Sequence, residues 1–132
     1  MTEDIISSDG AILCYIMRGN SLPAATKFIT PPDVTLQVGH IVHPRGHEIA
    51  RHAHRPQERL ISGTAEVLLI QHGRCELDIY DNNRDLVATR ELRAGDIVVL
   101  LNGGHGIRML EDTVLLEIKQ GPYPGPVEKE QF

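Results

Sequence analysis

The sequence predicts a small all-β domain. Of its 132 residues, 41% are hydrophobic but only 4% are aromatic, and none is Trp, so Ile, Leu and Val must supply the core. Such residues favour strands, and 12 Gly and 8 Pro favour the tight turns that join them. Turn residues recur about every 8 to 12 positions, which is typical of a β-sandwich or barrel. The length fits about one domain.

The N-terminal part of the chain is expected to contain three strands and a loop. Residues 11–17 are a short apolar run, typical of a buried strand. Residues 20–33 carry three prolines and no clear period, which indicates a loop with at most one helical turn, at 24–27. Residues 35–43 alternate apolar and polar positions up to a Pro-Arg-Gly turn, and 48–54 continue as a strand.

The rest of the chain is expected to be strands followed by a tail. Residues 55–63 form either one helical turn or an irregular excursion. Six further strands are expected, at 66–71, 75–80, 86–93, 97–101, 105–109 and 114–118. The Pro-rich tail cannot continue a ladder, and we expect it to lie over the barrel or a neighbouring subunit. The expected division is 1–34 as an N-terminal strand and loop, 35–120 as the main domain, and 121–132 as the tail.

Composition excludes several classes of partner. A net charge of -5, with no basic cluster, argues against nucleic acid. No run approaches the roughly 18 apolar residues of a membrane span, and the first residues are acidic where a secretory signal is basic, so we expect a cytoplasmic protein. Cys14 and Cys75 lie in apolar runs and are interpreted as buried free thiols.

A histidine pair is the first chemical signal. His52 and His54 are two positions apart on a predicted strand, so both rings point to one face and can reach one metal ion. Neutral imidazoles suit Zn, Cu, Fe and Ni. Alone, this pair is a weak signal, because such pairs are more often two surface or hydrogen-bonded histidines than a metal site.

The surrounding pattern resembles the first motif of the cupin superfamily, a group of small double-stranded β-helix barrels. That motif is a glycine, five residues, His-x-His, three or four residues, a glutamate, six residues and a glycine. Here five residues lie between Gly46 and His52, and six residues lie between Glu66 and Gly73. The departure is the gap of 11 residues between His54 and Glu66.

Two glutamates compete for the carboxylate position. Glu58 has the short spacing, but position 65, where the glycine should follow, is Ala65. Glu66 keeps the spacing to Gly73 and begins an apolar strand. We favour Glu66, with residues 55–64 as an insertion.

The second cupin motif is matched more loosely. It is a glycine, five residues, Pro-x-Gly, two residues and a histidine, and the stretch from Gly95 to His105 is one residue shorter and has no proline. His105 still follows a turn, where the third imidazole of the family lies. The resemblance covers about residues 35–120 and implies a cupin barrel that holds one divalent metal ion (Zn, Fe, Mn or Ni) through His52, His54, Glu66 and His105.

The resemblance leaves the activity open. A metal-dependent enzyme acting on an oxygen-rich small molecule is the first expectation, with a sugar or sugar-phosphate isomerase favoured over a dioxygenase. The alternatives are a non-catalytic module that binds a metal or small ligand, and a metal-free protein similar to nucleotide-sugar ketoisomerases that uses histidine acid-base chemistry. A homodimer is expected. Glu117 and Lys119 share one face of the last strand, where they either face solvent or line a substrate pocket.

Overall fold

The computed structural model describes residues 2–132, which divide into two compact units. The first, here called the sheet unit, comprises residues 2–22 together with Thr64–Phe132. The second, the insert unit, is Pro23–Gly63. The expected boundaries at residues 34 and 120 do not coincide with these units. None of the described residues belongs to a helix long and apolar enough to cross a membrane.

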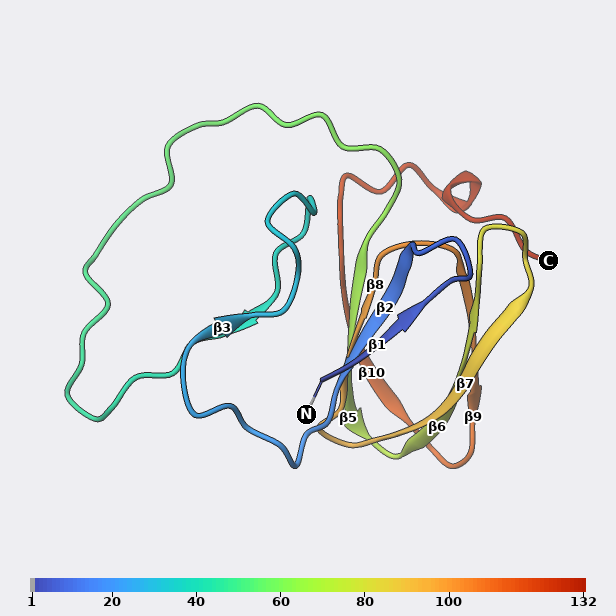
Figure 1. The fold of residues 1–132 in the computed structure, drawn as a ribbon, viewed down its shortest axis with the longest axis horizontal. Helices are drawn as coiled ribbons and strands as arrows, with labels where there is room; N and C mark the ends of the chain where they lie inside the picture. The colour runs from blue at the N-terminus through green and yellow to red at the C-terminus, as the bar shows by residue number, and fades with distance from the viewer. Residues whose placement is uncertain (1) are drawn as a thin grey trace. The chain divides into compact units, whose positions relative to one another are not determined.

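The sheet unit consists of two antiparallel sheets that face each other (Figure 1). The larger sheet has the order β1 (Thr2–Ile6), β2 (Ile12–Met17), β8 (Ile97–Leu100), β5 (Glu66–His72), β10 (Val114–Lys119). The smaller sheet has the order β7 (Leu86–Arg93), β6 (Arg74–Tyr80), β9 (Gly104–Met109). A single 3-10 turn, η1 (Pro126–Glu128), follows in the tail. The all-β class predicted from composition is confirmed, although among the described residues the sheets do not close into a barrel.

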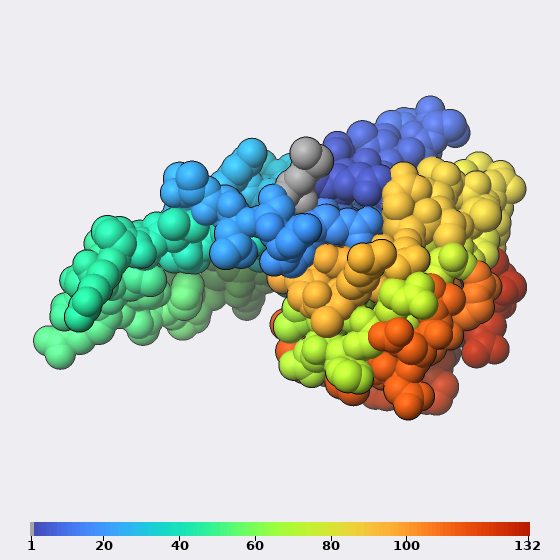
Figure 2. Space-filling view, turned by 90° about the horizontal axis from the view of Figure 1, so that it is seen from below, coloured from blue at the N-terminus to red at the C-terminus, as the bar shows by residue number. Residues whose placement is uncertain are grey.

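The core lies between these two sheets. Alternate positions of β5 and β6 point inward, as the two-residue period of a strand requires, so Leu68 and Ile70 meet Leu77 and Ile79. Strands distant in sequence are thereby joined: Figure 2 shows the dark blue N-terminal strands beside the yellow to orange β7. All side chains of this core are aliphatic or cysteine, as the low aromatic content predicts.

Most strand predictions in the sheet unit are confirmed to within one residue. The runs predicted from 66 to 118 correspond to β5, β6, β7, β8, β9 and β10, and the run at 11–17 corresponds to β2. The strand β1 was not predicted, because its sequence Thr-Glu-Asp-Ile-Ile is mostly polar. It is an edge strand, and only its Ile5 is buried in the core.

Two strand predictions in the insert unit are wrong. The strands expected at 35–43 and 48–54 reduce to β4 (Gly39–His40), which pairs with β3 (Lys27–Phe28). Neither 24–27 nor 55–63 forms a helical turn, so the irregular alternative holds for 55–63. The physical reason at 48–54 is the lack of an apolar face: Ile49 is its one large apolar side chain, and it is exposed.

Candidate metal and ligand site

A cavity of the sheet unit has a volume of about 700 Å³ and lies at the end of the sheets where β5 begins. Glu66, Tyr80, Arg84 and His105 line it from the sheets and their turns. The tail closes part of the wall through residues 128–132. This volume is in the range of pockets that hold small molecules.

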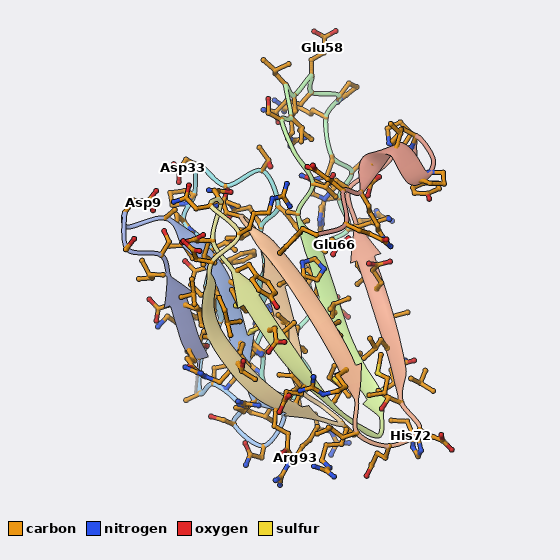
Figure 3. All side chains as sticks on the ribbon, turned by 90° about the vertical axis from the view of Figure 1, so that its right-hand side faces the viewer. Asp9, Asp33, Glu58, Glu66, His72 and Arg93 are labelled. Carbon is orange, nitrogen blue, oxygen red and sulfur yellow. The ribbon has the colours of Figure 1, made fainter. Side chains whose placement is uncertain are left out.

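Glu66 is the first residue of β5, and the strand directs its side chain inward. It has the same parity as the buried Leu68 and Ile70, and its ladder neighbours are Leu100 on β8 and Lys119 on β10. Only 7% of the residue is exposed. Figure 3 shows Glu66 and His72 at opposite ends of this strand, which separates the buried carboxylate from the exposed turn at Gly73.

His105 brings an imidazole to this carboxylate from the opposite sheet. Its Nε2 atom lies 3.3 Å from Glu66 Oε2. That oxygen is fully buried, and no donor among the described residues gives it a hydrogen bond of good geometry. The His105 imidazole is the main cause that holds the pKa of Glu66 below its ordinary value, against the raising effect of burial, while the nearby Lys119 lowers it further. The site therefore contains a buried, ionised and incompletely paired carboxylate.

Glu117 and Lys119, predicted either to line a pocket or to face solvent, have different environments. Lys119 is half-buried, and its Nζ atom lies 3.2 Å from Glu128 and 4.7 Å from the centre of the Tyr123 ring. The hydrogen bond that Lys119 donates to Glu128 raises the pKa of Lys119. Glu117 is exposed. Neither residue is part of the cavity wall. Both lower the pKa of the Glu66 carboxyl group, Glu117 through a side-chain hydrogen bond and Lys119 through its charge.

His52 and His54 form a second pair of donors, within the insert unit. The segment that carries them is not a strand, yet the centres of their rings are only 5.4 Å apart. The Nδ1 atom of His52 lies 2.8 Å from the carbonyl oxygen of Ala50 and must donate to it, which leaves Nε2 with a free lone pair in the neutral ring. A histidine that binds a metal is commonly held in this way. Both rings are exposed, as is Glu58.

The predicted ligands thus form two pairs, Glu66 with His105 in the sheet unit and His52 with His54 in the insert unit. Across residues 2–132 no three His, Cys, Asp or Glu side chains converge on one point. Another imidazole pair, His43 and His47, stacks with ring centres 3.9 Å apart. Stacked rings direct their nitrogen lone pairs in parallel rather than toward one ion, so this pair is a poor chelate.

Sequence reasoning missed one side of the cavity. Tyr80 and Arg84 lie at the end of β6 and in the following turn, and the tail residues Glu130 and Phe132 pack against them. The turn was predicted from its asparagines, but nothing in that signal says where an arginine side chain points. The tail was expected to lie over the strands or a neighbouring subunit, and its contacts with Arg84 and Lys119 place it on the sheet unit.

The chain was also compared with known proteins. No family profile, no curated protein and no solved structure matches it. Its function is therefore argued from the geometry of the two donor pairs and the cavity.

Proposed function

We propose that this chain is a cupin-type protein that binds one divalent metal ion and an oxygen-rich small molecule in the cavity of the sheet unit. The observation that carries the proposal is the buried Oε2 atom of Glu66, which accepts no hydrogen bond from the described residues. A buried carboxylate oxygen that accepts no well-formed hydrogen bond keeps unused acceptor capacity, which a bound cation would satisfy. Two antiparallel sheets that face each other support a cupin-type, jelly-roll-like architecture.

The donor atoms suit such an ion. Glu66 offers an oxygen and His105 a nitrogen 3.3 Å from it, a mixed set that Zn, Fe, Mn and Ni all accept. The resemblance assigns His52 and His54 to the same ion, and the hydrogen bond from His52 to Ala50 prepares that ring as a nitrogen donor. When bound, the ion would act as a Lewis acid toward oxygen atoms of the ligand. Isomerisation of a sugar or sugar phosphate remains the favoured reaction over oxygenation, and a homodimer the favoured assembly.

A second candidate needs no metal. The Glu66 carboxylate and the His105 imidazole lie close enough for proton exchange in a cavity that admits a ligand. A carboxylate beside an imidazole orients the ring, the arrangement used for general acid-base catalysis. This is the chemistry expected for a metal-free, ketoisomerase-like protein.

Metal content distinguishes the two. The metal content of tag-free protein is measured by plasma mass spectrometry after reconstitution with each candidate ion. The proteins compared are the native chain, Glu66→Gln, His105→Ala and the double variant His52→Ala/His54→Ala. His72→Ala is the matched control, since His72 is exposed at the far end of β5. Glu58→Gln tests the alternative carboxylate.

We expect about one equivalent of metal in the native protein, in His72→Ala and in Glu58→Gln. We expect this metal to be lost in Glu66→Gln and His105→Ala. Loss in the His52 and His54 double variant as well establishes the four-residue set. Retention there limits the ligands to the sheet unit. No metal in the reconstituted native protein overturns the metal proposal in favour of acid-base chemistry at Glu66 and His105, and loss in Glu58→Gln alone transfers the carboxylate to Glu58.

A further inference from the structure

The turn between β6 and β7 holds an arginine in an unfavourable backbone conformation. Arg84 has φ 71°, and it is the only described residue other than glycine with a positive φ. The turn is fixed by Asp81, whose Oδ1 accepts the N–H groups of Asn83 and Asp85 at 2.9 and 3.0 Å. Glycine would adopt this conformation without strain. Strain kept at a non-glycine residue is typical of functional positions.

The side chain of Arg84 lines the cavity, where it contacts the tail. Its Nη2 atom lies 2.6 Å from the carboxylate of Glu130, and its guanidinium carbon lies 4.5 Å from the centre of the Phe132 ring. The Phe132 ring also meets Tyr80 edge to face, with the ring centres 5.0 Å apart. The tail thus presents a carboxylate and a benzene ring to one arginine and one tyrosine.

These contacts are of the kind that exchange readily. The side chains of Glu130 and Arg84 are 80% and 43% exposed, and ion pairs so open to solvent contribute little to stability. The tail outside η1 has no strand or helix to hold it. A free carboxylate can therefore compete with Glu130 for the same guanidinium.

We propose that Arg84 and Tyr80 form a seat for a small aromatic carboxylate, and that Glu130 and Phe132 occupy this seat when no ligand is bound. The seat would engage both parts of such a ligand, by pairing of Arg84 with its carboxylate and by packing of its ring on Arg84 and Tyr80. Because the seat shares a cavity with Glu66 and His105, the bound molecule lies in the site of the proposed function, and the inference rests on that cavity being a ligand site.

Benzoate is the probe, titrated by calorimetry and by ligand-detected NMR into native protein and into Glu130→Gln, Arg84→Gln and Arg84→Gly. Cyclohexanecarboxylate lacks the aromatic ring, and benzamide lacks the charge. Arg93→Gln is the matched control, because Arg93 is an exposed arginine outside the cavity wall. Arg84→Gly keeps the turn geometry and guards against a folding defect in Arg84→Gln.

We expect benzoate to bind more tightly than either analogue, and severalfold more tightly to Glu130→Gln than to the native protein because the competing carboxylate is gone. Both Arg84 variants should weaken binding about tenfold or more, and Arg93→Gln should leave it unchanged. Absence of millimolar binding to Glu130→Gln, or equal binding in the Arg84 variants, overturns the proposal.

The two proposals fail in different ways. Metal content should be unchanged in every Arg84 and Glu130 variant, and benzoate should still bind Arg84 in chelator-treated protein. A protein without metal that nevertheless binds benzoate through Arg84 refutes the metal centre and retains the seat. A protein that binds metal, but whose affinity for benzoate is the same in the Arg84 variants, refutes the seat and retains the metal centre.

Discussion

Arg18 and Asp96 connect the end of β2 to the turn before β8, with Nη1 of the arginine 2.8 Å from Oδ2 of the carboxylate. The same carboxylate accepts the backbone N–H groups of Gly19 at 3.0 Å and Arg93 at 2.9 Å. Only 6% of Asp96 is exposed. One buried side chain thus joins two segments that are far apart in sequence, residues 18–19 and residues 93–96.

Replacing this carboxylate should destabilise the whole sheet unit. Asp96→Ala leaves two part-buried backbone N–H donors without their acceptor and Arg18 without its carboxylate partner, and we expect a loss of about 3 kcal/mol in the free energy of unfolding, measured by urea titration. The control is Glu111→Ala, which removes an exposed carboxylate 3.7 Å from Arg74. That change should cost at most about 1 kcal/mol. Equal losses in the two variants would contradict a special role for Asp96.

The glycine that ends the first cupin-like motif has a steric reason to be glycine. Gly73 has φ +85°, and a Cβ atom there would collide with the carbonyl oxygen of Asp112. Gly73→Ala should therefore lower stability by about 2 kcal/mol or more. Gly10→Ala is the control, because Gly10 has φ +89° but open space around it, and only the backbone strain of about 1 kcal/mol is expected. Comparing the thermal unfolding of Gly73→Ala and Gly10→Ala separates the cost of the steric collision from the cost of backbone strain.

The two thiols should be unreactive until the protein unfolds. Cys14 and Cys75 are fully buried, and burial is the main cause that raises the pKa of Cys14 to about 12. At pH 8 only about one part in 10⁴ of this thiol is ionised, and the thiolate is the reactive form. We expect modification by a disulfide reagent to be slow in buffer and immediate in urea. Rapid native-state labelling would show that the core opens locally.

Stability of the metal-free protein should depend on pH through Glu66. Because the folded pKa of Glu66 is lower than its ordinary value, the unfolded chain binds this proton more tightly. The ionised carboxylate therefore stabilises the fold above the ordinary pKa, and this stability is lost as pH falls through the folded value. Urea midpoints should fall less between about pH 5 and pH 3 in Glu66→Gln than in the native chain. Glu58→Gln, an exposed carboxylate, should follow the native curve.

The sequence predicts the sheet unit better than the insert unit, for a physical reason. In β5 and β6 buried and partly buried positions alternate, so the pattern and the packing agree. Around His52 and His54 there is little apolar surface to bury, and alternation alone did not produce a strand. The rings still come together, because two residues in extended backbone are close in any case.

The candidate site shows the same contrast. The proximity of Glu66 and His105 agrees with the cupin resemblance, which places both in one ligand set, whereas strand parity alone predicts only that Glu66 points inward. The contacts of Arg84 with Glu130 and Phe132 join positions separated by 46 and 48 residues without any shared pattern. The tail is not part of a strand, so its side-chain contacts correspond to no periodic pattern in the sequence and could not be predicted from one.

The tail gives the cavity a wall that can change independently of the sheets. Its contacts with Arg84 and Lys119 are made by side chains, and Gly104 leaves the room that the Phe132 ring fills, since a Cβ atom there would lie 2.8 Å from it. Exchanges along residues 128–132 can therefore reshape ligand preference while the core keeps its packing. Under the proposed function, the tail side of the cavity could therefore diverge in sequence without endangering the packing of the sheets.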